Sequence, residues 1–231
     1  MKLSIIIFCF NEAGTLKQLV HDTKNVLKHI ATQSEIIIVN DGSTDDTKII
    51  GDTLSVEHSD VIIIHHQQNK GIGMALQTGY AAANLDFICA VPGDGQFDVR
   101  ELLQISPFDD SRYYSFYRIK TGYSVYRKTL TWLNRLFNQH ILSIYLRDVN
   151  WIKVYRKTQL QMVNPQLTSS LIESEICAKL YKSNILPIEI PSQYLSRTYG
   201  TSNGGSWKTL KKAITDLSRL WLEVIKYPKR H

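Results

Sequence analysis

The chain has 231 residues, of which 43% are hydrophobic and 21% are charged, and its formal net charge is +6. This composition supplies a substantial core, in one domain or in one domain with an appendage. The positive charge favours an anionic partner: a phosphorylated small molecule, an anionic membrane surface or nucleic acid.

No apolar run approaches the roughly 20 residues of a membrane-spanning helix. The start of the chain, MKLSIIIFCFNEAG, has no small-residue cleavage site of a signal peptide, so we expect a cytoplasmic protein. The three cysteines, Cys9, Cys89 and Cys177, are isolated within apolar segments. This pattern implies neither a disulfide framework nor a thiolate metal site, and it indicates small core residues.

Four near-continuous apolar runs, rich in β-branched residues, occupy residues 4–9, 35–39, 60–64 and 86–91. This pattern is typical of strands buried on both faces of a parallel sheet. Apolar residues with a 3.6-residue period predict an amphipathic crossover helix over 13–30. The first half is therefore predicted to be a βαβ array.

The turn after the second run, Asp45-Asp46-Thr47, predicts the start of a second crossover helix, because carboxylates there satisfy free backbone N–H groups. A glycine-rich stretch, 69–79, follows the third run. Its glycines allow the backbone to approach a ligand or the sheet closely. Their spacing does not fit G-x-G-x-x-G, which disfavours a Rossmann dehydrogenase.

The pattern changes after residue 100. A stretch rich in Tyr and Arg covers 112–135, and a helix is predicted over 132–144. We expect this half to determine specificity. Tyrosines interleaved with arginines can bind nucleic acid, but no recognised nucleic-acid module accompanies them, so we expect no such partner. Polar loops around 109–110 and at 201–206 are candidates for mobile segments, the latter for a lid.

From Trp207 onward, an amphipathic helix is predicted. Its apolar stripe comprises Trp207, Leu210, Ile214, Leu217, Trp221 and Val224, and its basic face carries Lys208, Lys211, Lys212, Arg219 and Lys226. Such a helix could lie on an anionic bilayer or could dock on the core of its own domain. The sequence leaves both alternatives open.

Three polar turns follow the predicted strands: Phe10-Asn11-Glu12, Asn40-Asp41-Gly42-Ser43 and Gly93-Asp94-Gly95-Gln96. In an open parallel sheet, the ligand lies beyond the carboxyl ends of the strands, so these turns are placed to meet one ligand. Asp41 and Asp94 are the leading candidates. The alternative is that such acids and glycines only cap helices and form turns, which we favour for Asp45 and Asp46.

Taken in order, the segments SIIIFCFNE, EIIIVNDGSTDDT, NKGIGMALQTG and GDGQFD resemble the motifs of family 2 inverting glycosyltransferases with the GT-A fold. The resemblance runs from residue 3 to about 202 and is strongest to the branch that transfers sugars to polyprenyl phosphates, the dolichol-phosphate mannose synthase branch. It implies an α/β domain, with a mostly parallel sheet flanked by helices, over 1–205. Residues 1–100 would bind a nucleotide sugar, 101–205 would face the acceptor, and 206–231 would form the terminal helix.

The resemblance also implies roles for individual residues. Phe10, Glu12 and Asp41 would contact the base and ribose of a UDP- or GDP-sugar, and Ser43, Asn69 and Gly71 would complete the donor site. Asp94 and Gln96 would hold Mg²⁺ or Mn²⁺ against the diphosphate, since hard dications bind oxygen ligands.

The chain departs from this family at two places that matter for chemistry. Pro92 stands where the usual Asp-x-Asp pair has its first carboxylate, and Trp151-Ile152 stands where Cys-Gly or Ser-Gly is usual. The first change leaves Asp94 with fewer partners for a metal. The second places a bulky pair on the acceptor side.

The acceptor determines which residues would act. A lipid phosphate is already anionic and needs no general base, so we expect Arg118, Arg127 and Arg197 to bind it through their planar guanidinium groups. A glycan hydroxyl would need a base, for which Glu175 and Asp148 are the candidates. A third hypothesis is a catalytically silent protein that only binds nucleotide sugars.

Overall fold

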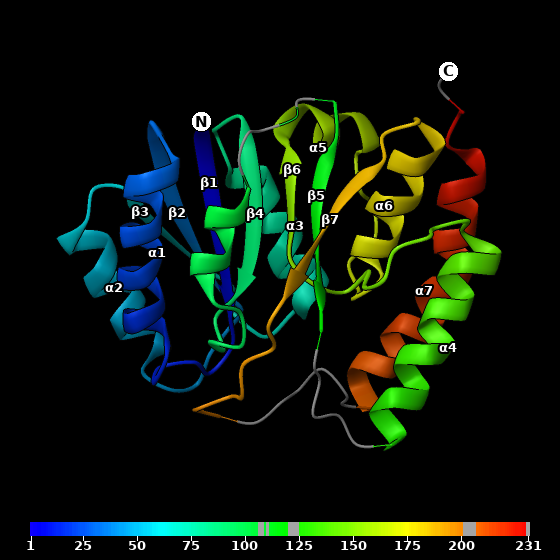
Figure 1. Cartoon of the computed structure of the whole chain (residues 1–231). Coiled ribbons are helices and arrows are strands. Elements are labelled where there is room, and N and C mark those ends of the chain that lie inside the picture. Colours follow the sequence, from blue (N-terminus) through cyan, green and yellow to red (C-terminus); the bar gives the residue numbers. More distant parts are fainter. Residues whose placement is uncertain (106–108, 110, 120–124, 201–206, 230–231) are drawn as a thin grey trace.

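The computed structural model describes residues 1–105, 109, 111–119, 125–200 and 207–229, without the side chains of 125–128, 130 and 207–213. Within these ranges seven strands form one sheet in the order β3-β2-β1-β4-β6-β5-β7 (Figure 1). The strands are β1 (Lys2–Cys9), β2 (Gln33–Asn40), β3 (Val61–His65), β4 (Phe87–Pro92), β5 (Tyr113–Arg118), β6 (Lys153–Arg156) and β7 (Pro187–Ser192). Strands β1 to β4 are mutually parallel, β5 pairs parallel with β7, and β6 is antiparallel to both its neighbours.

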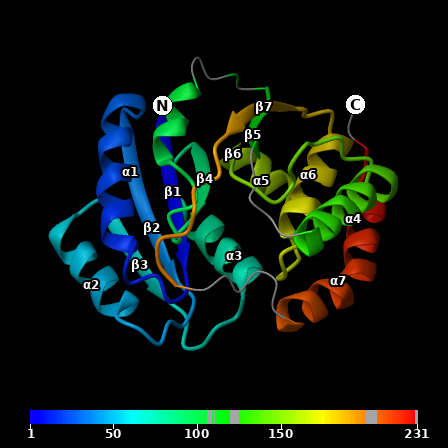
Figure 2. The same ribbon diagram turned by 60° about the horizontal axis from the view of Figure 1, so that its bottom comes forward.

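Helices cover both faces of the sheet. They are α1 (Leu16–Ile30), α2 (Thr47–Glu57), α3 (Ile72–Ala82), the 3₁₀ helix η1 (Val99–Gln104), α4 (Val125–Ile141), α5 (Lys157–Val163), α6 (Ile172–Lys182) and α7 (Trp207–Lys226). One core cluster joins α1, α2 and η1 to the sheet, and a second joins α3, α5, α6 and α7 to the other face. Figures 1 and 2 show α4 and α7 on the same side of the molecule, beyond α6.

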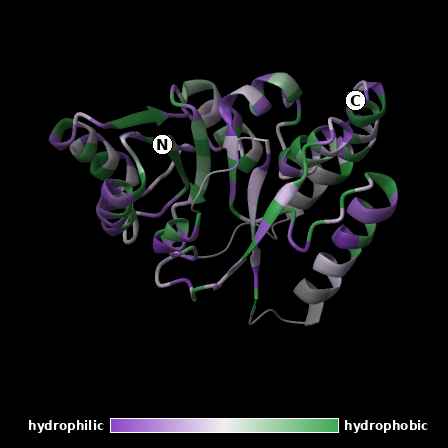
Figure 3. Cartoon of the chain, turned by 45° about the horizontal axis from the view of Figure 1, so that its top comes forward, coloured by the Kyte–Doolittle hydropathy of each residue, from purple (hydrophilic) through white to green (hydrophobic). Residues whose placement is uncertain are grey.

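The central strand β1 shows why this arrangement forms. Its successive side chains alternate between the two clusters: Ile5 and Ile7 pack with α1, whereas Ile6 packs with α3, and all three are fully buried. Figure 3 shows the strands of the parallel half in the colours of hydrophobic residues. A strand that is apolar on both faces is stable only between two layers of helices.

The first half of the fold confirms the predicted βαβ array. All four predicted strands and the first two crossover helices form, with boundaries that agree to within three residues. In the second half, the predicted helix over 132–144 is instead Val125–Ile141, and β5 lies inside the Tyr/Arg-rich stretch. The predicted mobile segment at 201–206 and residue 110 lie outside the described residues.

The terminal helix α7 docks on the core through a stripe that shares Leu217 and Val224 with the predicted one and adds Leu220. Leu220 is fully buried and Val224 is 7% exposed, whereas Ile214 and Trp221 of the predicted stripe are 56% and 49% exposed. Lys182 Nζ donates hydrogen bonds to the carbonyl groups of Val224 and Tyr227, which closes the end of the helix on α6. Among the described residues no helix has both the length and the apolarity needed to cross a bilayer.

Close packing of α3 on β1 makes Gly79 a sensitive position. A Cβ there would lie 2.4 Å from Ile6 Cγ2, in the fully buried centre of the sheet. We expect Gly79→Ala to lower the free energy of unfolding by about 1–3 kcal/mol through overpacking. Gly51→Ala is the matched control, because its Cβ would meet only the mobile end of Ile63. Urea unfolding of both variants tests this, and equal effects would contradict it.

Candidate active site

The carboxyl ends of β1, β2 and β4 meet at one edge of the sheet. Hydrogen bonds continue the parallel ladder into the turns: Asp41 N–H donates to Cys9 O and Gly93 N–H donates to Phe8 O, both at 2.9 Å. Thr15 Oγ1 donates to Gly93 O at 2.6 Å and so ties the first turn to the third. The three polar turns therefore lie side by side, as the sequence predicts.

The first two turns hold each other through side-chain to backbone hydrogen bonds. Asn11 adopts positive φ (58°), its N–H donates to Ser43 Oγ, and its Oδ1 accepts from Thr44 N–H. Glu12 N–H donates to Thr47 Oγ1, and Ala13 N–H donates to Asp45. The acid and hydroxyl side chains of this region thus fix the position of Glu12.

Asp45 caps backbone groups, as predicted: its Oδ1 accepts from Thr47 N–H at 3.0 Å. Asp46 occupies the N-cap position of α2, and its side chain makes no capping hydrogen bond. The capping prediction therefore holds for the side chain of Asp45 alone.

Asp41 is buried and both its oxygens are occupied. Oδ1 accepts from Lys70 N–H at 2.9 Å and lies 2.6 Å from His66 Nδ1, and Oδ2 accepts from Gly71 N–H at 2.8 Å. Gly71 has a φ of +91°, which favours glycine and lets its N–H point at the carboxylate. Asp41 therefore fixes the loop that leads into α3, and a contact to a donor base stays a prediction.

A second group of charges gathers Glu12, Asp94 and Arg197. Arg197 Nη2 lies 2.8 Å from Asp94 Oδ2 and 3.2 Å from Glu12 Oε1. Burial, together with the negative charge of Asp94, raises the pKa of Glu12 to about 7 against the lowering effect of Arg197. Two carboxylates from different strand ends thus share one cationic group.

The segment that follows β7 brings Arg197 to this position. Leu195 N–H donates to Gln96 O at 3.0 Å, Gln96 Nε2 donates to Tyr194 Oη at 2.6 Å, and the Tyr199 ring lies against Gly14. Figure 1 shows this segment in orange, passing below the carboxyl ends of β4 and β1. Residues 193–200, the strap, therefore lie against the first and third strand-end turns.

The second half of the chain contributes an arginine held between a carboxylate and aromatic rings. Arg118, at the end of β5, bonds Asp148 through Nε at 2.6 Å and through Nη2 at 2.9 Å. Its guanidinium carbon lies 4.7 Å from the centre of the Trp151 ring and 5.7 Å from that of Tyr194. Trp151 Nε1 donates to Ser192 Oγ at 2.9 Å, so the unusual Trp151 packs against the start of the strap.

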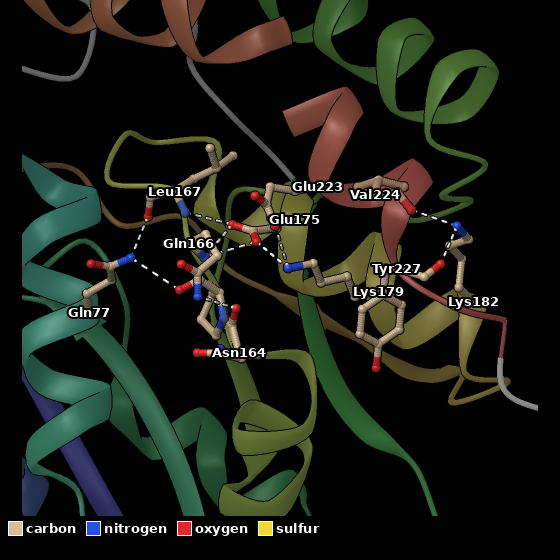
Figure 4. A network of polar contacts seen from close by, with 11 residues as sticks. Gln77, Asn164, Gln166, Leu167, Glu175, Lys179, Lys182, Glu223, Val224 and Tyr227 are labelled. Carbon is tan, nitrogen blue, oxygen red and sulfur yellow. Dashed lines mark hydrogen bonds and ion pairs between the residues drawn. The ribbon is translucent and has the colours of Figure 1, made fainter. Parts of the chain in front are cut away.

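Glu175 is not brought to these turns. It is fully buried in α6, where its oxygens accept from the N–H groups of Gln166 and Leu167 and from Lys179 Nζ (Figure 4). Among the described residues no contact joins it to the strand-end turns. A fully enclosed carboxylate with these partners cannot reach a substrate, so the structure supports a role in folding.

The remaining predicted residues have simpler environments. Phe10, Ser43 and Asn69 are half-buried at the strand-end edge, where their side chains can still meet a ligand. The side chain of Arg127, in the first turn of α4, lies outside the described residues. The donor-site residues therefore gather at one edge, and their contacts to a ligand stay predictions.

The sequence also matches a known protein family. The family model described as Glycosyl transferase family 2 matches residues 4–168, which include all three strand-end turns and Arg118 with Asp148. The chain belongs to glycosyl transferase family 2. Its sheet, covered by two layers of helices, has the GT-A fold.

Two kinds of curated relative match the chain, one over most of its length and one over less than half. Undecaprenyl-phosphate 4-deoxy-4-formamido-L-arabinose transferase of Klebsiella pneumoniae is 26% identical over 207 residues, covering 87% of this chain and 62% of the relative. Poly-beta-1,6-N-acetyl-D-glucosamine synthase of Staphylococcus aureus is 32% identical over 92 residues, covering 40% of this chain and 21% of the relative. The chain thus spans less than two thirds of the length of these curated relatives.

Solved structures agree on the fold. Glucosyl-3-phosphoglycerate synthase from Mycobacterium tuberculosis, crystallised with Mn²⁺, UDP and phosphoglyceric acid, matches with a TM-score of 0.69 at 16% identity, covering 95% of this chain and 78% of that one. Staphylococcus aureus TarS 1-349 matches with a TM-score of 0.62 at 17% identity, covering 98% and 66%. At these identities the likeness establishes the GT-A fold alone.

Sequence reasoning missed two sets of partners. His66 contacts Asp41, whereas the neighbouring His65 contacts Asp52. Because side chains alternate along an extended chain, the sequence indicates that these two histidines point to opposite faces. Tyr194 and Trp151 pack against Arg118, and no local sequence pattern predicts that contact. The first set could have been found from strand geometry, and the second depends on tertiary structure.

Asp45 gives the site a testable dependence on pH. Burial acts to raise the pKa of Asp45, but hydrogen bonds from Thr47 and Ala13 outweigh it and lower that pKa. The stabilisation is therefore complete above the unfolded pKa, about 4, and is lost as the pH falls through the lower folded value. We expect Asp45→Asn to destabilise on the order of 1 kcal/mol at pH 7 and to equal the wild type in strong acid, by thermal melting across pH. A constant difference would contradict this.

Proposed function

We propose that this glycosyltransferase moves a hexosyl group from a UDP- or GDP-sugar to a polyprenyl phosphate at the cytoplasmic face of a membrane, with inversion at the anomeric carbon. The observation that carries the proposal is the pairing of Asp148 with Arg118 beside the strand-end turns. It supports an acceptor that is already anionic.

The donor side of the proposal rests on the convergence of the three turns. Phe10, Ser43 and Asn69 line one edge with Glu12 and Asp94, where backbone and polar groups can take a nucleotide. Asp41 supports them from below through the loop at Lys70 and Gly71. A nucleotide that spans these turns would carry its diphosphate toward Asp94.

A divalent cation fits the charge of this edge. Asp94 Oδ2 already holds the cationic Nη2 of Arg197, which indicates that the position attracts positive charge. Asp94 and Gln96 would hold Mg²⁺ or Mn²⁺, whose charge offsets the charge that develops on the departing diphosphate. Mn²⁺ is present in the crystals of the structural neighbour, which adds support for a dication of this class.

The acceptor side distinguishes a phosphate from a hydroxyl. A hydroxyl must lose its proton to a base as it attacks. Glu175 is enclosed, and both oxygens of Asp148 accept hydrogen bonds from Arg118. A phosphate oxygen needs neither residue as a base, and Arg118 offers it a cation at the same place.

The reaction then requires no proton transfer. A phosphate oxygen attacks the anomeric carbon from the face opposite the diphosphate, and the new carbon–oxygen bond forms as the bond to the diphosphate breaks. The electron pair of the broken bond leaves with the nucleoside diphosphate. Arg118, with Arg127, would hold the acceptor phosphate, and Arg197 lies on the diphosphate side with Asp94.

The hydroxyl acceptor has one observation in its favour. The glucosamine synthase relative matches over 92 residues, 40% of this chain. The arabinose transferase relative matches over 207 residues and so extends into the acceptor side. The longer match favours polyprenyl phosphate, and a silent binding protein would keep the donor contacts without any turnover.

Asp94→Asn tests the activity. With polyprenyl phosphate, Mn²⁺ and radiolabelled UDP- or GDP-sugars, we expect wild-type protein to transfer label into an organic-extractable product. The variant should lose at least about 100-fold, because it removes charge stabilisation of the leaving group. Asp98→Asn is the matched control, since Asp98 lies four residues away and pairs with Arg100. Label transferred only to soluble glycans would reject the lipid acceptor, and no turnover of any donor would support the silent protein.

Contact with an anionic membrane is part of this proposal. The exposed face of α7 carries Trp221, Leu222 and Ile225, with 44–53% of each residue exposed, and Arg219 and Lys226 are exposed beside them. Apolar side chains flanked by basic ones suit the interface of an anionic bilayer. A helix that docks through Leu220 and Val224 can still present this second face to lipid.

Ile225→Ser tests the membrane contact. We expect affinity for vesicles that contain phosphatidylglycerol to fall by about three- to tenfold, because one apolar side chain no longer enters the interface. Ile49→Ser is the matched control: Ile49 is 65% exposed on α2, and Ile225 is 53% exposed on α7. Equal loss in both variants, or no loss in either, in a sedimentation assay would remove the membrane contact from the proposal.

A further inference from the structure

Arg197 marks a point where two carboxylates converge. A single nitrogen, Nη2, lies 2.8 Å from Asp94 Oδ2 and 3.2 Å from Glu12 Oε1. These acids follow β4 and β1, which are adjacent parallel strands with Phe8 opposite Pro92. The sheet register therefore places the turn after β1 beside the end of β4. At this end of β4, Pro92 stands where a carboxylate would otherwise be.

The second oxygen of Glu12 has an unusual environment. Glu12 is 5% exposed, and its Oε2 has no hydrogen-bond partner among the described residues. Buried carboxylate oxygens are normally satisfied, so an unsatisfied one indicates a missing partner. Gly200 lies beside that oxygen: a Cβ at this position would be 3.8 Å from it, at ordinary van der Waals contact.

Asp94 and Gln96 by themselves offer a cation few oxygen atoms. Asp94 Oδ1 accepts from the N–H group of Gln96, and the side-chain amide of Gln96 bonds Tyr194. No group of three or more His, Cys, Asp or Glu side chains suited to a metal occurs in the described part of the chain. Mg²⁺ is commonly bound through one or two carboxylates together with phosphates and waters, so two converging carboxylates suffice.

We propose that Glu12 is the second carboxylate of a divalent-cation site with Asp94, and that Arg197 occupies this site as a stand-in cation when no metal is bound. The inference rests on the proposed function in that the metal serves the donor diphosphate. In this site the second carboxylate comes from Glu12, after the neighbouring strand β1, and not from position 92, where the chain has proline. Arg197 and the metal would therefore compete for the carboxylates of Glu12 and Asp94.

The alternative is that Glu12 and Arg197 form only a structural pair that holds the strap. The two roles differ in the effect of removing Arg197. In a structural pair, loss of either partner loosens the strap and disturbs Asp94 in the same direction. In a cation site, loss of Glu12 weakens metal binding, whereas loss of Arg197 strengthens it.

Direct Mn²⁺ binding separates these roles without a substrate. The electron paramagnetic resonance signal of free Mn²⁺ would be titrated with metal-free protein, using wild type, R197Q, E12Q and the double variant R197Q/E12Q. We expect R197Q to bind Mn²⁺ at least about tenfold more tightly than wild type, since a competing unit charge is gone. Adding E12Q to R197Q should weaken binding at least about tenfold, because loss of a ligand exceeds the usual effect of losing an outer partner.

Three controls keep the result interpretable. R197Q/D98N should bind Mn²⁺ like R197Q, since Asp98 faces Arg100. Thermal melting checks the fold of each variant, and E12D, which keeps the charge on a shorter side chain, replaces E12Q if that variant does not fold. Mg²⁺ should displace Mn²⁺, as expected for a site of oxygen ligands.

The proposal is overturned if R197Q binds no Mn²⁺, if R197Q binds more weakly than wild type, or if E12Q has no effect in the R197Q background. Failure of the proposed function gives a different result. Binding of Mn²⁺ that depends on Glu12 in a protein that transfers no sugar would leave the cation site intact. If the protein transfers sugar to lipid but its Mn²⁺ affinity does not depend on Glu12, the proposed transferase activity stands and the proposed cation site is wrong.

Discussion

The parallel pairing of β1 with both β2 and β4 is the constraint on which the rest of the structure depends. Because all three strands run in one direction and are apolar on both faces, their polar turns must leave the sheet at one edge. Hydrogen bonds that extend the ladder past Cys9 and Phe8 then fix the height of each turn. The position of Glu12 relative to Asp94 is therefore a consequence of register in the core.

The sequence predicts the first half well because one physical signal dominates it. Apolar β-branched runs can only be buried strands, and the turns that follow them must converge. The second half mixes signals. Strand β7 contains Pro187 and Pro191, which argue against a central strand, and within the described part of the chain it is an edge strand that pairs with β5 alone. Strand β6 begins with Lys153, whose buried charge is matched by Glu173 at 3.3 Å.

Within the site, the sequence predicts which turns meet but not their partners. Asp94 and Arg197 are 103 residues apart, and the ion pair exists because the strap returns across the sheet edge. Glu175 shows the opposite error: its motif context predicts a catalytic residue, whereas its position on α6 encloses it with Lys179. Motifs identify residue types, and only the path of the chain decides which of them face a ligand.

The acids at this edge already have partners, so binding a charged substrate is an exchange of partners. Asp41 holds backbone N–H groups and is fixed, because releasing it would leave those groups unsatisfied. Asp94 and Asp148 each hold an arginine, and a cation or an anionic acceptor can replace one member of such a pair without leaving a buried charge alone. Glu12 differs from them because one of its oxygens lacks a partner among the described residues. In the proposed cation site, a bound cation would give that oxygen the partner it lacks and would offset the cost of leaving it buried and unsatisfied.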